Sequence, residues 1–174
     1  ESMLEMFKRY EFDRESWKAI KERCDELGVI FMSTPQNQTD LNLLLDLGVP
    51  AIKVGSDDFT NIPLLKSYSN TKLPLIVSMG MSDLAEAFTA LSEIGTFDGY
   101  PTALLLCTSQ YPTPPHDVNL FKLKTLSNTF PDLILGFSDH TQGSLASSLA
   151  VAFGAKVFEK HFTLDKKMIG PIIR

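Results

Sequence analysis

The run from Leu133 to His140, LILGFSDH, decides how this sequence is interpreted. Its first five residues are apolar or glycine, as in a strand that is buried on both faces of a sheet, and its last three are polar. We expect this run to be one of six parallel strands, because the same form recurs in five other short runs. These are Val29–Pro35, Ala51–Ser56, Leu75–Met81, Ala103–Ser109 and Lys156–Asp165.

Helical patterns separate the predicted strands. The starts of successive strands lie 22 to 30 residues apart, which fits one strand, one crossover helix and two short loops. Asp13 is placed to cap a helix over residues 14–27, and Gly28 to end it. The other predicted helices cover residues 41–47, 84–94, 119–130 and 144–153.

Two α/β architectures fit this alternation, an open doubly wound sheet and a (β/α)₈ TIM barrel. An open sheet concentrates its site at one switch point, and the glycine-rich first turn of a dinucleotide-binding sheet is missing. Six consecutive strands with polar carboxyl ends instead fit a ring of loops around one central site, which favours the barrel. A complete barrel has eight units in about 250 residues. We therefore expect residues 1–174 to form a partial TIM-barrel domain with about six units, whose first two strands precede residue 1 or come from a partner.

Composition excludes several classes of protein. The chain has 174 residues, of which 44% are hydrophobic and 21% charged, the profile of a globular rather than a disordered protein. A balance of 16 Lys and Arg against 21 Asp and Glu argues against a nucleic-acid surface. Apolar runs are too short to cross a membrane, and the first residues do not form a signal peptide. Two cysteines make no disulfide framework, so we expect a cytoplasmic protein without membrane or nucleic-acid partners.

His140 and His161 stand at the ends of two successive predicted strands. In a barrel these strands are neighbours, so both imidazoles can approach one ion. Two neutral nitrogens with water or a carboxylate suit Mn²⁺, Zn²⁺ or Fe²⁺ better than Ca²⁺ or Mg²⁺. The alternative is two independent, hydrogen-bonded and inert histidines. His116 lies in a proline-rich loop and is predicted to be a surface residue.

Lys53 lies inside an otherwise apolar run, AIKVGS from Ala51 to Ser56. A buried lysine is costly unless its charge has a partner. An anionic substrate group, a Schiff-base role and a buried ion pair with a carboxylate all remain possible partners or roles. Glu159 is on the same predicted strand as His161 and either exchanges protons or pairs with Lys160 or a core lysine.

Hydroxyl side chains end several of the predicted strands. As neutral donors they can surround a phosphate or carboxylate, although each alone is an ordinary cap of a strand end. Tyr111 is either a wall of the same site or a packed loop aromatic, and Cys107 is predicted to be a small buried hydrophobic residue. The hydroxyl residues concerned are Thr34, Ser56, Ser78, Ser109 and Ser138.

Five segments together resemble the sialic acid synthase family, which includes N-acetylneuraminate, legionaminate and pseudaminate synthases and spore-coat polysaccharide relatives. The resemblance runs in order from about Phe12 to Pro171. It implies a transferase with a barrel fold that condenses phosphoenolpyruvate with an N-acyl mannosamine-type aldose, giving a nonulosonic acid and phosphate. It also implies a divalent metal, typically Mn²⁺, and a homodimer. The segments are Ser33–Pro35, Lys53–Ser56, Cys107–Pro112, Gly136–Thr141 and Glu159–Thr163.

The resemblance assigns roles to particular residues. It implies that His140 and His161 hold the metal and that Glu159, His140 and Lys53 are catalytic. The implied substrate-binding residues are Thr34, Lys53, Ser56, Ser78, Ser109, Tyr111 and Ser138.

The resemblance also marks where this sequence departs from the family. It places a glutamate and a second lysine before residue 1 and an antifreeze-like domain outside this chain. It also places an acidic residue after Gly170-Pro171, where this sequence has Ile172-Ile173-Arg174. Two other functions stay open: a lysine-dependent aldolase that forms an imine on Lys53, and a non-catalytic barrel remnant that binds a sugar phosphate.

Overall fold

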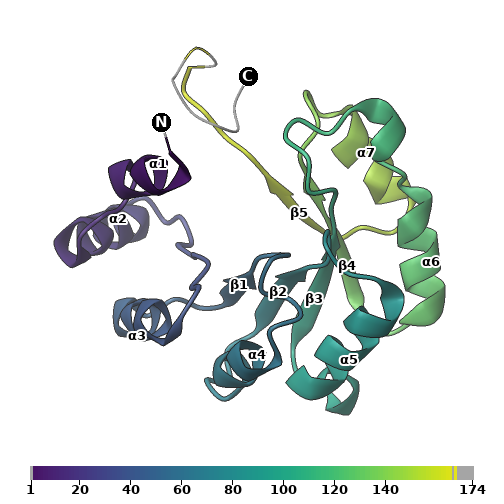
Figure 1. The fold of residues 1–174 in the computed structure, drawn as a ribbon, viewed down its shortest axis with the longest axis horizontal. Coiled ribbons are helices and arrows are strands. Elements are labelled where there is room, and N and C mark those ends of the chain that lie inside the picture. The colour runs from purple at the N-terminus through teal and green to yellow at the C-terminus, as the bar shows by residue number, and fades with distance from the viewer. Residues whose placement is uncertain (1, 166, 168–174) are drawn as a thin grey trace.

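Five parallel strands form the sheet in a computed structural model that describes residues 2–165 and 167 (Figure 1). Each strand pairs in parallel with the next one in the sequence, so the order in the sheet is β1-β2-β3-β4-β5. The sheet curls and carries helices along its outer face, which makes it a half-barrel. The strands are β1 (Ile52–Val54), β2 (Leu75–Ser78), β3 (Thr102–Leu106), β4 (Ile134–Asp139) and β5 (Val157–Lys160).

Helices connect the strands and follow the arc of the sheet (Figure 1). Three of them precede the sheet in the sequence, and the first two are α1 (Met3–Arg9) and α2 (Arg14–Glu26). The rest are α3 (Gln38–Leu47), α4 (Ile62–Ser69), α5 (Leu84–Ile94), α6 (Phe121–Thr129) and α7 (Leu145–Ala152), with the 3₁₀ turns η1 (Thr96–Asp98) and η2 (Pro115–Asp117).

The predicted helices are confirmed to within a few residues. Asp13 caps α2 by accepting a hydrogen bond from the Ser16 N–H. The side chain of Asp83 accepts one from the Glu86 N–H, while the Glu86 side chain accepts one from the Asp83 N–H. The sequence analysis did not identify α1 or α4, which have seven and eight residues.

The core lies between the sheet and its helices. Side chains alternate along a strand, so every second residue faces the helices. Ile52 and Val54 of β1, Val77 of β2 and Leu104 and Leu106 of β3 are buried in that layer. Residues of the other parity, which include Lys53, Ser78, Ser138 and Glu159, therefore face the concave side.

The predicted strand Val29–Pro35 is wrong, and the half-barrel has five strands rather than six within the described residues. The segment approaches β1, because the N–H of Lys53 donates a hydrogen bond of 3.3 Å to the carbonyl of Ser33. A single bond does not make a ladder, and Val29 and Ile30 are 55% and 75% exposed rather than packed.

Two further expectations concern the whole chain. Among the described residues, none of the helices has the length and apolar character needed to cross a bilayer. Cys24 and Cys107 are free thiols, as expected. The predicted departure at Ile172-Ile173-Arg174 lies outside the described residues.

Candidate active site

A pocket of about 310 Å³ opens where the strands end at their carboxyl side. A larger hollow of about 560 Å³ lies between α5 and α6, and its lining is mainly apolar. It contains none of the predicted site residues. The smaller pocket brings together most of the predicted site residues, namely Lys53, Ser56, Ser78, Ser109, Tyr111, Ser138, His140 and Glu159.

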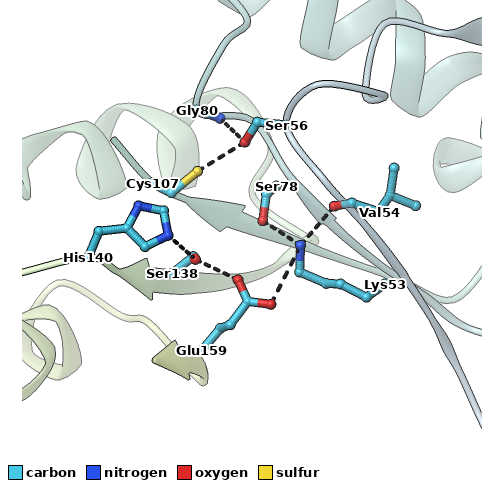
Figure 2. Close-up of polar contacts among 9 residues, drawn as sticks. All are labelled: Lys53, Val54, Ser56, Ser78, Gly80, Cys107, Ser138, His140 and Glu159. Atoms are coloured by element: carbon cyan, nitrogen blue, oxygen red, sulfur yellow. Dashed lines mark hydrogen bonds and ion pairs between the residues drawn. The ribbon is translucent and has the colours of Figure 1, made fainter. Parts of the chain in front are cut away.

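Lys53 is the buried cation of this pocket and is only 8% exposed (Figure 2). Its ammonium group donates hydrogen bonds of 2.8 Å to the carbonyl of Val54 and to Oγ of Ser78. Burial lowers the pKa of Lys53, and the nearby Glu159 carboxylate opposes that change. An ammonium group has three N–H bonds, so the third faces the Glu159 carboxylate or an anionic ligand that enters the pocket.

Glu159 joins Lys53 to the neighbouring strand. Its Oε1 lies 3.6 Å from Nζ of Lys53, so the expected pairing with a core lysine is present. Lys160 instead pairs with Asp139 at 2.9 Å. Ser138 is the register partner of Glu159 across β4 and β5 and donates a hydrogen bond of 2.5 Å to its Oε2 (Figure 2).

His140 is held in one tautomer. Its Nδ1 lies 2.7 Å from the carbonyl oxygen of Thr108, and a carbonyl can only accept, so Nδ1 carries the proton. In the neutral ring, Nε2 therefore presents a lone pair, 3.2 Å from Oγ of Ser138. A backbone carbonyl that fixes a histidine in this way is common among metal ligands.

His161 follows β5, and its ring approaches the ring of His140. The two centroids are 5.5 Å apart, and Tyr111 contacts both rings, at 4.2 Å from His140 and 5.6 Å from His161. Partial burial and the neighbouring His140 lower the pKa of His161, which favours the neutral, ligating form.

The ring of His140 lines the pocket and that of His161 lies 5.5 Å from it, outside the lining, and imidazole nitrogens are donors that suit a divalent transition metal. Within residues 2–165 and 167, no group of three or more His, Cys, Asp or Glu side chains is arranged to hold an ion.

Three segments meet around Ser56. The N–H of Gly80 donates a hydrogen bond of 2.9 Å to Oγ of Ser56, which also lies 3.1 Å from Sγ of Cys107 (Figure 2). Cys107 is 5% exposed, so its predicted burial is confirmed, but it also has a polar contact that the sequence did not reveal.

Thr34 is not part of the pocket lining, because it lies in the irregular segment before β1. Asp139 does not orient His140; its carboxylate accepts hydrogen bonds from Thr141 and Ser147, which hold the loop and α7 to β4. His116 has an 80% exposed side chain, as predicted.

Sequence reasoning missed Asp57 and Met81 among the lining residues, which also include Gly55, and it missed Gly80 beside them. The signal for the glycines is their spacing. Gly55 and Gly80 stand two positions after Lys53 and Ser78, so the period of a strand places them on the same side of the sheet.

Comparisons with known proteins point to one family. The profile of the NeuB family matches residues 1–172. The N,N'-diacetyllegionaminic acid synthase of Legionella pneumophila is 42% identical over 174 residues, 98% of this chain and 49% of that protein. The N-acetylneuraminate-9-phosphate synthase of Drosophila melanogaster is 37% identical over 160 residues, 92% of this chain and 43% of that protein.

A solved structure is also similar. The N-acetylneuraminic acid synthetase of Leptospira borgpetersenii, in complex with citrate, superposes with a TM-score of 0.88 at 35% identity, covering 93% of this chain and 56% of that one. The chain thus spans about half the length of the relatives it matches.

Proposed function

This chain belongs to the NeuB family, and on that premise we propose that it is the barrel part of a synthase that joins phosphoenolpyruvate to an N-acyl mannosamine-type aldose. The products are a nonulosonic acid and phosphate. Relatives named as sialic acid and legionaminic acid synthases support a sugar acid synthase role.

The observation that carries the proposal is the buried Lys53 with hydroxyl groups around it. Its ammonium group contacts Ser78, and Ser56 and Ser138 line the same pocket. A cation with several hydroxyl groups in the same pocket suits a small anion with a phosphate and a carboxylate, because the ammonium and the hydroxyls can donate hydrogen bonds to its oxygens.

The proposed metal ligands are His140 and His161. When bound, a divalent cation such as Mn²⁺ would act as a Lewis acid on the aldehyde oxygen of the sugar. Tyr111, packed against both imidazoles, would form the wall beside the sugar.

The residues of this chain chiefly position the substrates and hold a proton. Carbon 3 of phosphoenolpyruvate forms the new bond to the aldehyde carbon while its own double bond shifts, and the aldehyde π bond breaks so that its oxygen becomes a hydroxyl. A water molecule adds to carbon 2, and its two protons end on that hydroxyl and on the released phosphate as carbon 2 becomes a ketone. The bond between carbon 2 and the phosphate oxygen then breaks. We assign Glu159 as the acceptor of the proton from that water, since Ser138 and Lys53 hold its carboxylate at the pocket.

The experiment that tests this proposal is phosphate release by the natural full-length protein with phosphoenolpyruvate, Mn²⁺ and a series of N-acyl mannosamine-type sugars. We expect release that depends on both substrates. No release with any sugar of this class would contradict the proposal. Sedimentation of the same protein would test the expected homodimer.

A lysine-dependent aldolase is the second candidate, because burial lowers the pKa of Lys53 and a neutral amine is the form that makes an imine. Treatment with pyruvate and borohydride separates the two functions. The aldolase would gain a covalent adduct on Lys53, whereas the synthase would not. A barrel remnant would bind ligand without either reaction.

A further inference from the structure

Ser56 receives contacts from two other strand ends. The backbone N–H of Gly80, after β2, donates to Oγ of Ser56 at 2.9 Å, and Sγ of Cys107, after β3, lies 3.1 Å from the same oxygen. Figure 2 shows the three groups in a row beside the pocket. The contact between Cys107 and Ser56 joins residues 51 positions apart in the sequence.

The space around Gly80 keeps these groups together. A Cβ at Gly80 would lie 2.5 Å from Sγ of Cys107, 2.9 Å from Oγ of Ser109 and 3.0 Å from Oγ of Ser56. Only glycine allows three side chains from two other strand ends to approach the backbone this closely. The missing side chain at Gly80 thus leaves room for the thiol and both hydroxyls beside the backbone.

The number of hydrogen bonds that the Ser56 hydroxyl can make suggests what the Cys107 thiol does. A hydroxyl has one hydrogen and two lone pairs, and the Gly80 N–H already uses one lone pair. If Ser56 donates to the sulfur, it has no hydrogen left for a ligand. If the thiol donates to Ser56, both lone pairs are used and the hydroxyl hydrogen points to another acceptor, which an anion in the pocket provides.

We propose that Cys107 is a positioning residue, whose thiol donates to Ser56 and so directs the Ser56 hydroxyl toward the anionic ligand held beside Lys53. This inference rests on the proposed phosphoenolpyruvate pocket. It predicts a role in substrate affinity that a cysteine acting only as a space-filling hydrophobic residue would not have.

The test compares Cys107→Ala, Cys107→Ser, Ser56→Ala and the Ser56→Ala/Cys107→Ala double variant of the full-length protein. Calorimetry measures phosphoenolpyruvate binding, and steady-state kinetics separate KM from kcat. We expect Cys107→Ala to weaken phosphoenolpyruvate binding about fivefold, the value of one neutral hydrogen bond, with little change in kcat. Cys107→Ser keeps a donor and should restore most of the affinity.

The double variant decides whether Cys107 acts through Ser56. We expect it to bind phosphoenolpyruvate no more weakly than Ser56→Ala alone, because the thiol then has no hydroxyl to orient. Two outcomes would overturn the role of Cys107. One is a double variant in which the two losses of phosphoenolpyruvate affinity multiply, and the other is a Cys107→Ser variant that binds phosphoenolpyruvate as weakly as Cys107→Ala. If Cys107→Ala does not fold, Cys107→Val fills the space without a donor and replaces it.

The proposed function and this inference fail in different ways. An unsubstituted protein that neither binds phosphoenolpyruvate nor releases phosphate would refute both. A protein that binds and turns over phosphoenolpyruvate, with an affinity that Cys107→Ala leaves unchanged, would refute the inference alone.

Discussion

Nζ of Lys53 lies 3.6 Å from Oε1 of Glu159, and the two side chains differ in their access to water. The lysine side chain is 10% exposed and the glutamate side chain 44%. Removing the lysine therefore leaves a carboxylate that is still hydrated, rather than an unpaired buried charge. This asymmetry separates the effect of Lys53 on activity from its effect on stability.

Replacing Lys53 with methionine should lower phosphate release about 100-fold or more, because the anionic substrate loses its cation. The free energy of unfolding should change by less than about 1 kcal/mol, since relief of a desolvated charge offsets the two lost hydrogen bonds. Turnover and denaturant titration measure the two effects. Lys66→Met, at a surface ion pair, is the control that should change neither. A large loss of stability in Lys53→Met would show that its charge is mainly structural.

Removing bound metal with a chelator should abolish phosphate release, and Mn²⁺ should restore it. His140→Ala and His161→Ala should each weaken Mn²⁺ binding by about 10-fold or more, measured by calorimetry. His116→Ala serves as the control, because that side chain is 80% exposed and does not line the pocket. Equal Mn²⁺ affinity in all three variants would contradict a metal site at His140 and His161.

Tyr68→Phe should destabilise the segment before β1. The Tyr68 hydroxyl donates a hydrogen bond to the carbonyl of Pro35 and is fully buried, so its loss should cost about 1 kcal/mol near pH 8. Burial, reinforced by Asp58, Asp40 and Asp57, raises the pKa of Tyr68 above its ordinary value of 10.0.

The sign of the pH dependence follows from that raised pKa. The stabilisation by Tyr68 is fully present below the unfolded-state pKa near 10 and is lost as the pH rises above it. Urea titrations should therefore show that the free energy of unfolding falls more steeply with pH in the unsubstituted protein than in Tyr68→Phe. The range to compare is about pH 9 to about pH 10.5, where an ordinary tyrosine begins to lose its proton. Parallel curves for the two proteins would argue against a buried Tyr68 hydroxyl.

Gly136→Ala should be severely destabilising, by about 3 kcal/mol or more. A Cβ at this position in β4 would lie 2.4 Å from the backbone oxygen of Val157 and 2.3 Å from Cδ2 of Leu105. Gly143→Ala makes a useful comparison, because its φ of 78° strains an alanine but nothing lies within 4 Å. It should cost only about 1 kcal/mol. If urea titrations gave equal losses of stability for Gly136→Ala and Gly143→Ala, β4 and β5 would have to separate readily to make room for the added methyl group.

The strand-helix alternation and most helix bounds could be predicted from the sequence, because apolar runs and capping residues are local signals. Asp83 and Gly95 are examples, since each acts within its own helix end. The segment Val29–Pro35 has the composition of a strand but lacks a ladder partner among the described residues. Pairing depends on neighbours that are distant in the sequence, so composition alone could not settle it.

Most of the predicted site residues lie together because carboxyl ends of parallel strands share one edge. The contacts themselves were not predictable. Lys53 had three candidate partners, and only the register of the sheet brings Glu159 and Ser78 to it. Cys107 could not be distinguished from a hydrophobic filler, because its partner Ser56 belongs to another strand end.

Ser138 touches both halves of the pocket, since its hydroxyl reaches the imidazole of His140 and the carboxylate that faces Lys53. We expect a ligand that changes the contact of Ser138 with one of these groups to affect its contact with the other, and by thermodynamic linkage such an influence is mutual. We expect the two ligands to be coupled: the factor by which phosphoenolpyruvate changes the affinity for Mn²⁺ should equal the factor by which Mn²⁺ changes the affinity for phosphoenolpyruvate.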